Sequence, residues 1–265
     1  MPGMSGLVFS GKRGRLLKTG QTTQYSSELD DGYYEKGLSR GYTVLSTGGY
    51  SGTINIDLTH FASTCAFDAA TKTITKVGAM GVFKAAGGET IVISGAGQAG
   101  NNGVFTTASA TADTVVTVEA LTDEAAGPTV IIKKRESHSN NAVFDQRTGL
   151  MWSRYVSGKM GTGGTGGMPW TGVPYDIFAY CAAANAASLA GYTDWRVPNI
   201  EESLNLRIFE APAVSVDSTA FPSGLNGWCS TTVPDDVTRS WLIDASPLNS
   251  QPKTLAVTVP LVRGG

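Results

Sequence analysis

The sequence predicts an α+β protein, because helix signals are confined to two short C-terminal stretches while strand and turn signals occur throughout. Of its 265 residues, 33 are glycine, above the usual glycine share of roughly 7%. A hydrophobic content of 41% can supply a normal core. These observations predict a turn-rich, strand-rich chain of one large domain or two small ones.

The first helix is predicted between Tyr175 and Leu189, where apolar residues recur at steps of three or four and give one buried stripe. The second is predicted to start near Ile200. Asn199 stands where an N-cap oxygen would accept free amides of the first turn, and Glu202 follows three residues later as a capping-box partner.

Strands are predicted in four β-branched runs bounded by Gly, Asn, Asp or Pro, at residues 89–94, 103–107, 113–119 and 129–133. Asn101, Asn102 and Gly103 form a turn between two of them. The four runs indicate a small β-sandwich or barrel. Nearer the C-terminus, residues 241–244 and 254–259 are predicted strands of a twisted antiparallel sheet.

A series of motifs in the C-terminal hundred residues indicates a family. They are Thr-Gly-Leu-Met-Trp-Ser at 148–153, Ala-Gly-Tyr-Thr-Asp-Trp-Arg-Val-Pro-Asn-Ile-Glu-Glu at 190–202, Trp-Cys-Ser-Thr-Thr at 228–232, Trp241, and Val-Arg-Gly-Gly at 262–265. In this order they resemble the family named after the C-terminal domain of the bacterial collagen-like adhesin Lcl. The resemblance implies a divergent C-type-lectin-like fold and a display or binding domain.

The resemblance also implies a discontinuous domain. Residues 16–40 resemble the opening of family members, and residues 67–75 and 143–149 are expected to begin and end a single hairpin. We therefore expect an N-terminal arm at 1–15, a lectin-like domain at 16–76 and 135–265, and an inserted β-module at 77–134. The pattern Ala-Gly-Asn-Asn-Gly-Val-Phe-Thr at 99–106 is similar to small β-modules of phage tail and decoration proteins.

The family motifs supply the expected structural residues. Trp152, Trp195 and Trp228 are predicted to lie in the core. Asp194 and Arg196 flank Trp195, so we expect an ion pair that joins the helices to the last strand through Arg263. Trp241 belongs to the same set of motif residues.

Contact with a ligand or partner is expected in loops outside the motifs, at residues 161–174, 233–240 and 246–253. The candidate contact residues are Trp170, Tyr175, Asp235, Asp236 and Arg239. Trp170 can be an interface anchor or a sugar-stacking platform, with packing in its own domain as the alternative.

Composition and motifs argue against several other classes. A net charge of -2 gives no general attraction to nucleic acid. The sequence contains no apolar run of about 18 residues, so no membrane-spanning segment is predicted. No secretory leader is visible, which predicts synthesis and retention in a cytoplasm or export by another route. The glycine-rich segment 161–167 lacks the Lys-Ser/Thr of a phosphate-binding loop.

No cofactor or metal is expected. Cys65, Cys181 and Cys229 have no Cys-x-x-Cys spacing, and His60 and His138 have no matched catalytic partner in sequence. Calcium at Asp30–Asp31 or at Asp235–Asp236 remains an alternative.

These expectations favour a non-enzymatic structural or display protein of a tailed-bacteriophage virion, as tail, fibre or head decoration. Its partners would be other virion subunits, including copies of itself, and a glycan or protein of the host surface. The first alternative is a bacterial surface adhesin domain that binds glycans. The second is an enzyme of the formylglycine-generating kind, which would need an active cysteine pair.

Overall fold

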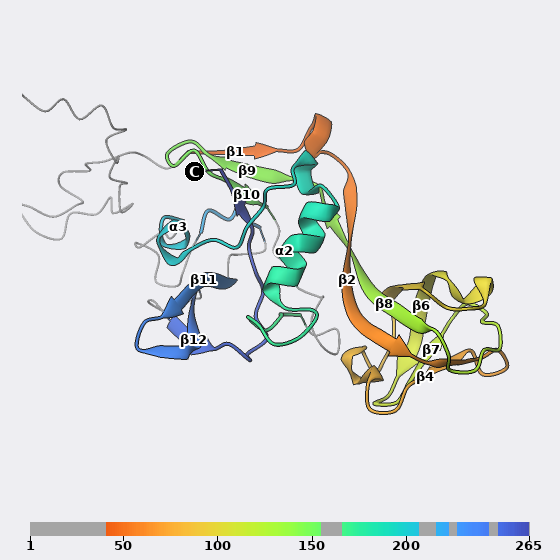
Figure 1. Ribbon diagram of the computed structural model, residues 1–265. Coiled ribbons are helices and arrows are strands. Elements are labelled where there is room, and N and C mark those ends of the chain that lie inside the picture. Colours follow the sequence, from red (N-terminus) through yellow and green to blue (C-terminus); the bar gives the residue numbers. More distant parts are fainter. Residues whose placement is uncertain (1–40, 155–165, 207–215, 223–226, 244–248, 265) are drawn as a thin grey trace, which may run out of the picture.

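The computed structural model describes residues 41–154, 166–206, 216–222, 227–243 and 249–264 (Figure 1). They form two lobes, which two long strands connect. The helix-bearing lobe contains both α-helices, a four-stranded sheet and a three-stranded sheet, and the all-β lobe contains most of a seven-stranded sheet. The α+β prediction is therefore confirmed at the level of fold class.

The four-stranded sheet of the helix-bearing lobe has the order β1-β9-β10-β14, and all its pairs are antiparallel. Its strands are β1 (Tyr42–Leu45), β9 (Ala142–Asp145), β10 (Met151–Ser153) and β14 (Val262–Arg263). Trp152 on β10 is opposite Val143 on one side and Val262 on the other. This sheet therefore places the Trp152 motif beside the last strand of the described chain.

The three-stranded sheet has the order β11-β12-β13 and is also antiparallel. Its strands are β11 (Gly227–Val233), β12 (Asp236–Ile243) and β13 (Asn249–Pro252). Val233 pairs with Asp236, so β11 and β12 are joined by a tight turn. On β12, Ser240 and Leu242 are buried while Trp241, between them, points to the opposite face and is half-buried.

Two α-helices are described, α2 (Ile177–Ala186) and α3 (Ile200–Leu204), and both were predicted. α2 begins at Ile177 because the Asp176 side chain accepts the backbone N–H groups of Phe178 and Ala179. α3 has the predicted capping box between Asn199 and Glu202. Neither helix is long and apolar enough to cross a membrane.

The all-β lobe is built on one antiparallel sheet of order β2-β8-β5-β6-β7-β4-β3. The strands are β2 (Thr53–Thr64), β3 (Ala66–Asp68), β4 (Thr73–Thr75), β5 (Thr90–Ser94), β6 (Gly103–Ala110), β7 (Thr114–Thr117) and β8 (Thr129–Ser139). The four strands predicted between residues 89 and 133 are therefore confirmed. They enclose a separate core whose large members include Phe61, Phe67, Phe83 and Phe105.

Among the described residues, four short 3₁₀ turns connect these elements: η1 (Gly48–Tyr50), η2 (Met80–Val82), η3 (Ala99–Asn101) and η5 (Leu189–Gly191). η1 contacts η5, which brings the chain before β2 against the chain after α2. The 3₁₀ turn η3 and the bend after it lie where the sequence predicted a turn.

Strands β2 and β8 run through both lobes and pair along nearly their whole length (Figure 1). Ile56 and Leu58 of β2 pack in the helix-bearing lobe, while Phe61 packs in the core of the all-β lobe. The register of the pair shifts between Thr59 and Phe61, so His60 lies at a β-bulge. The bulge changes which residues of β2 face inward, and this allows one strand to serve both cores.

The structure corrects the predicted hairpin of residues 67–75 and 143–149. β3 pairs with β4 and β4 with β7, whereas β9 pairs with β1 and β10. Phe67 of β3 and Ile74 of β4 are directly opposite each other, and both side chains are buried in the all-β core. The predicted module boundary at residue 77 therefore falls after two strands that belong to this sheet.

A second correction concerns residues 254–259, which form no continuous strand. A turn follows Pro252, where Leu255 donates its N–H to the Pro252 carbonyl, and Val257 and Val259 are single bridge residues, Val257 opposite Met168. The predicted arm at 1–15 and the family-like opening at 16–40 lie outside the described residues.

The shared strands predict where the all-β lobe can be removed. Residues 60–132 can be replaced by an Asn-Gly turn, because Thr59 and Lys133 are directly opposite on β2 and β8. We expect the shortened chain to retain one cooperative transition in tryptophan fluorescence, since all five tryptophans lie in the helix-bearing lobe. The control is a protein that lacks residues 77–134. We expect it to aggregate, because Phe67 and Ile74 then lose the core in which they are buried. Loss of the transition in the 60–132 deletion would show that the lobes fold as one unit.

Candidate binding surface

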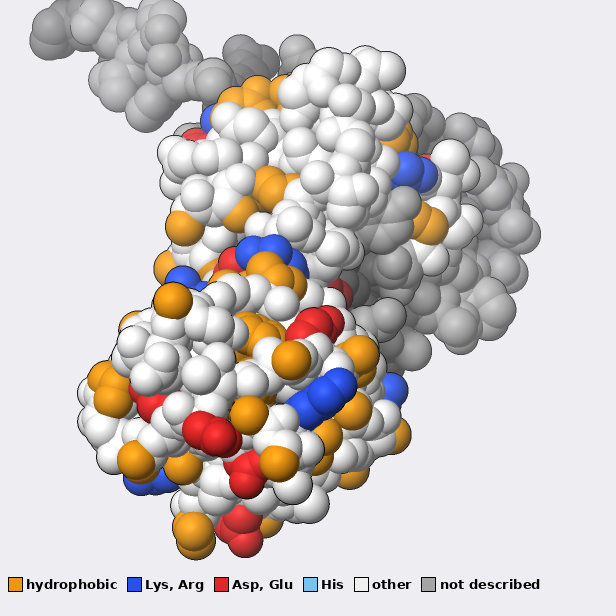
Figure 2. All heavy atoms as spheres, turned by 90° about the vertical axis from the view of Figure 1, so that its right-hand side faces the viewer, with side chains coloured by type: hydrophobic (Ala, Val, Ile, Leu, Met, Phe, Trp, Pro, Cys, Tyr) orange, Lys and Arg blue, Asp and Glu red, His pale blue; other side chains and the backbone are white. Residues whose placement is uncertain are grey.

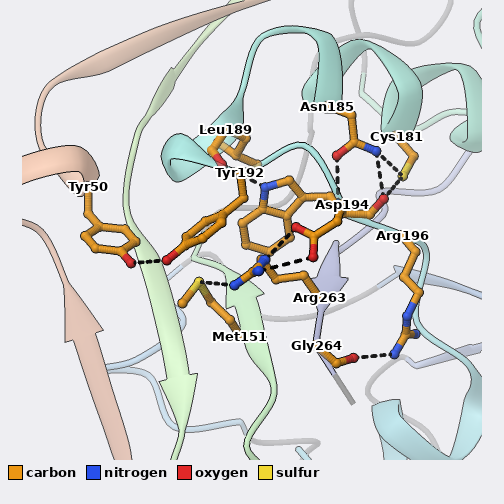
Figure 3. A network of polar contacts seen from close by, with 11 residues as sticks. Tyr50, Met151, Cys181, Asn185, Leu189, Tyr192, Asp194, Arg196, Arg263 and Gly264 are labelled. Atoms are coloured by element: carbon orange, nitrogen blue, oxygen red, sulfur yellow. Dashed lines mark hydrogen bonds and ion pairs between the residues drawn. The ribbon is translucent and has the colours of Figure 1, made fainter.

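Trp195 is held by polar contacts on both its backbone and its ring, from Asn185, Cys181 and Leu189, which Figure 3 labels. Asn185 of α2 accepts the Trp195 N–H at 2.7 Å and donates to its carbonyl at 2.8 Å. The indole Nε1 donates to the Leu189 carbonyl at 2.7 Å, and Cys181 Sγ donates to the Trp195 carbonyl at 3.1 Å. The ring is 3% exposed, so the predicted core position of Trp195 is confirmed.

Asp194 and Arg263 form the predicted ion pair. Arg263 Nε and Nη2 donate to the two carboxylate oxygens at 2.7 and 3.1 Å, and these contacts hold the pKa of Asp194 below its usual value. The guanidinium also lies over the Tyr192 ring, 3.6 Å from its centroid, and the Tyr192 hydroxyl hydrogen bonds with that of Tyr50 at 2.7 Å. The C-terminal strand is thereby connected to both η5 and η1.

Arg196, on the other side of Trp195, binds Glu202. Arg196 Nη1 donates to Glu202 Oε2 at 2.7 Å and Nη2 to Oε1 at 2.5 Å, while Nη2 also reaches the Gly264 carbonyl at 3.1 Å. Burial raises the pKa of Glu202, but hydrogen bonds from Arg196 and from the Asn199 N–H outweigh it and leave that pKa below its usual value. Arg196 therefore connects the capping box of α3 to the C-terminal strand.

The other motif tryptophans differ in burial. Trp152 and Trp228 are fully buried, as predicted. The Trp228 indole N–H donates to the Met168 carbonyl at 3.0 Å. Trp241 is half-buried on the face of β12 that points away from the core residue Leu242. Of the four, Trp241 is the one with part of its ring available at the surface.

Trp170 is packed in its own domain. Its Nε1 donates to the Cys229 carbonyl at 2.8 Å, Lys253 Nζ lies 3.9 Å from the ring centroid, and Phe178 contacts the ring edge-on at 4.8 Å between centroids. One ring face is thus covered by a cation of the same chain. The geometry therefore favours the alternative given for Trp170, packing in its own domain, over a sugar-stacking platform.

Tyr175 contacts the junction between the lobes. Its ring stacks on His60 with centroids 4.6 Å apart and an angle of 1° between the planes. His60 is also tilted against Phe83 of the all-β lobe at 6.5 Å. Tyr175 therefore connects the segment before α2 to the all-β lobe, a role that its sequence surroundings did not indicate.

The remaining predicted contact residues lie on the β11–β12 hairpin. Asp235 is exposed in its turn. Asp236 Oδ1 accepts the Thr238 side-chain and backbone groups, which lower the pKa of Asp236. Arg239 donates to the side chain and carbonyl of Ser250 on β13. Residues 233–240 are therefore mainly a hairpin instead of the expected long loop; residues 161–165 and 246–248 of the other two loops lie outside the described residues.

The three cysteines are free and buried. Burial raises the pKa of Cys65 to about 12 and those of Cys181 and Cys229 to about 11. The thiols are therefore protonated at neutral pH and are poor nucleophiles. Within the described part of the chain, no three His, Cys, Asp or Glu side chains gather where a metal ion could bind; Asp30 and Asp31 lie outside it.

Two polar residues that sequence reasoning missed are important in the structure. Asn185 fixes the backbone of Trp195, and Lys134, 2% exposed, binds Glu89 at 2.9 Å and donates to the Val82 carbonyl at 2.7 Å. The signal for Lys134 was present, because it follows Val130 and Ile132 at steps of two and so shares their inward face. No local signal identified Asn185.

Comparison with known proteins supports the motif-based prediction. The family model of the Lcl C-terminal domain matches residues 141–263, from the start of β9 to β14. The match confirms the family that the motifs predicted for residues 141–263. Searches of curated proteins and of solved structures found no match.

The Arg196–Glu202 pair predicts a pH-dependent stability. We expect Glu202→Gln to lower the free energy of unfolding at pH 7 by about 1 kcal/mol, because the neutral amide keeps an acceptor for the Asn199 N–H but loses the partly exposed ion pair with Arg196. Because the folded-state pKa of Glu202 is below its unfolded value of about 4.3, this stabilisation is present above that pH and disappears as the pH falls through the folded-state pKa.

Chemical denaturation at a series of pH values measures the difference between wild type and variant. Glu201→Gln is the matched control, because Glu201 is exposed in the same first turn. A difference that stayed constant into acid, or an equal effect of the two substitutions, would refute the assigned role of Glu202.

Trp170 gives a second prediction. We expect Trp170→Ala to lower the free energy of unfolding by about 2 kcal/mol or more, because it removes a hydrogen bond and contacts with Phe178 and Lys253. Trp241→Ala should cost less, since Trp241 does not face the core. Urea unfolding of both variants measures the two losses of unfolding free energy. A larger loss for Trp241→Ala would show that Trp170 is the more dispensable ring.

Proposed function

We propose that this chain is a non-enzymatic structural protein displayed on the virion of a tailed bacteriophage, as tail, fibre or head decoration, where it contributes to host attachment. In this proposal the helix-bearing lobe is a C-type-lectin-like domain and the all-β lobe is a domain inserted into it. Its partners are other virion subunits, further copies of the chain, and a glycan or protein on the host surface.

The observation that carries the proposal is the position of the all-β lobe along the chain: its strands come between β1 and β9, which are neighbours in the sheet of the lobe that contains the match to the Lcl C-terminal domain. The sequence of its η3 segment is similar to that of small β-modules of phage tail and decoration proteins. A second folded lobe on a display domain adds surface for assembly without changing the scaffold.

The polar groups of the helix-bearing lobe support a non-enzymatic role. Asp194, Arg196 and Glu202 are engaged in contacts that join the helices to the last strand. The thiols of Cys181 and Cys229 are buried and protonated, which disfavours the alternative of an enzyme with an active cysteine pair.

The exposed hairpin between β11 and β12 is the part of the predicted contact set that remains suited to a host ligand. Asp235 is exposed, Val237 is 73% exposed, and Arg239 and Trp241 alternate with the buried Ser240 and so share the other face of β12. Tryptophan and arginine are the side chains most enriched at binding hot spots. This surface also supports the alternative function, a bacterial adhesin domain that binds glycans.

Fractionation of the source culture distinguishes the two functions. Antibodies raised against the purified chain are used to follow it through a density gradient of particles released by lysis. We expect the chain to band with the particles that contain DNA. Recovery with the cell envelope would favour the adhesin, and recovery only in the soluble fraction would contradict both functions.

A further inference from the structure

A lysine and a glutamate lie together inside the all-β lobe. Charged side chains are visible on the surface of this lobe, the lower part of Figure 2, but the side chain of Lys134 is 2% exposed and that of Glu89 is 11% exposed. On β8, Lys134 is directly opposite the buried residues Leu58 of β2 and Ile91 of β5. Its Nζ lies 5.6 Å from the centroid of the Phe83 ring. The amine and the carboxyl group are therefore in a largely apolar part of the lobe.

The protein holds the reacting atoms of this pair in place. Lys134 Nζ lies 2.9 Å from Glu89 Oε1 and donates to the Val82 carbonyl at 2.7 Å. Glu89 Oε2 accepts the backbone N–H of Lys84 at 2.6 Å. The backbone of Glu89 is fixed by Thr107 of β6, whose hydroxyl accepts the Glu89 N–H and whose own N–H is donated to the Glu89 carbonyl, both at 2.9 Å. Nζ is thus kept against a carboxyl group whose carbon, Cδ, is one bond away from the contacted oxygen.

An ion pair is a costly state for two groups in this position. Each charge loses its hydration on burial, and the attraction between the charges offsets this loss only where hydrogen bonds satisfy the remaining donors and acceptors. In the described part of the chain, Glu89 Oε1 has no hydrogen-bond donor other than Lys134. Burial lowers the pKa of Lys134, and the contact with Glu89 offsets this only in part. The surroundings therefore favour a form of the pair in which neither group is charged.

We propose that Lys134 and Glu89 are joined by an amide bond between Nζ and Cδ, formed within the folded lobe. The ammonium group first gives a proton to Glu89 Oε1, and the neutral amine then attacks Cδ. Oε2 carries the negative charge of the tetrahedral intermediate, where the Lys84 N–H stabilises it. The nitrogen passes a second proton to Oε1, which leaves as water while the double bond between Cδ and Oε2 forms again. No oxidant, reductant or further reactant is consumed.

The product matches the groups that surround the pair. The hydrogen that remains on Nζ is donated to the Val82 carbonyl, and the amide oxygen, formerly Oε2, accepts the Lys84 N–H. Both buried charges are removed, so their desolvation no longer opposes folding. The bond links β8 to the segment before β5 and closes a covalent loop, which lowers the entropy of the unfolded chain. It requires no partner and therefore holds whether or not the proposed function is correct.

Intact mass spectrometry of the denatured full chain tests the bond. We expect the wild-type mass to be lower than the mass calculated from the sequence by one water molecule. Lys134→Arg keeps the positive charge beside Glu89 but removes the amine, so it should have its full calculated mass. Lys133→Arg is the matched control, because it has the same composition as Lys134→Arg and changes the half-buried neighbour on β8. The two variants should therefore differ in mass by one water molecule.

Peptide mapping locates the bond. Phe105 provides a chymotrypsin cleavage site between Glu89 and Lys134, so the digest of wild type should contain one branched peptide that joins the two segments. Its absence, or a wild-type chain with its full calculated mass, would overturn the proposal and leave a buried ion pair. Equal masses of the Lys133→Arg and Lys134→Arg variants would do the same. The wild-type mass decides the question even if a variant does not fold.

Discussion

The helix-bearing lobe depends on one constraint, the fixing of the three-residue segment Asp194–Arg196. The middle residue, Trp195, is held to α2 by two hydrogen bonds with Asn185, and Arg196 exchanges two backbone hydrogen bonds with Val262. The charged side chains on either side of Trp195 then reach Arg263 and Glu202. Because these contacts reach α2, α3 and β14 from three consecutive residues, this segment sets how the helices and the sheet lie together.

The second organising feature is the sharing of β2 and β8 between the lobes. A single bulge at His60 turns the inward face of β2 from one core to the other, and Tyr175 packs on that histidine from the segment before α2. The junction is therefore filled by aromatic packing as well as by backbone pairing. In the proposed function, such a junction holds the all-β lobe at a defined orientation to the exposed hairpin between β11 and β12.

Local features of the fold were predictable from sequence, and non-local ones were not. The capping box of Asn199 and Glu202 can be recognised from four consecutive residues. The strands between residues 89 and 133 can be recognised from their β-branched runs. The assignment of Phe67 and Ile74 depends on which distant strand they pair with, and that information is absent from their neighbourhood. Trp170 was ambiguous for the same reason, because Cys229, Lys253 and Phe178 approach it from separate parts of the chain.

Native-state hydrogen exchange of the full chain tests the central role of the Asp194–Arg196 segment most directly. The amides of Trp195, Arg196 and Val262 all donate within this set of contacts. If the segment fixes the lobe, the three amides exchange only when the lobe unfolds, with the same opening free energy as its most protected core amides. Exchange of these amides through local opening at a much smaller free energy, with the lobe still folded, would contradict the account.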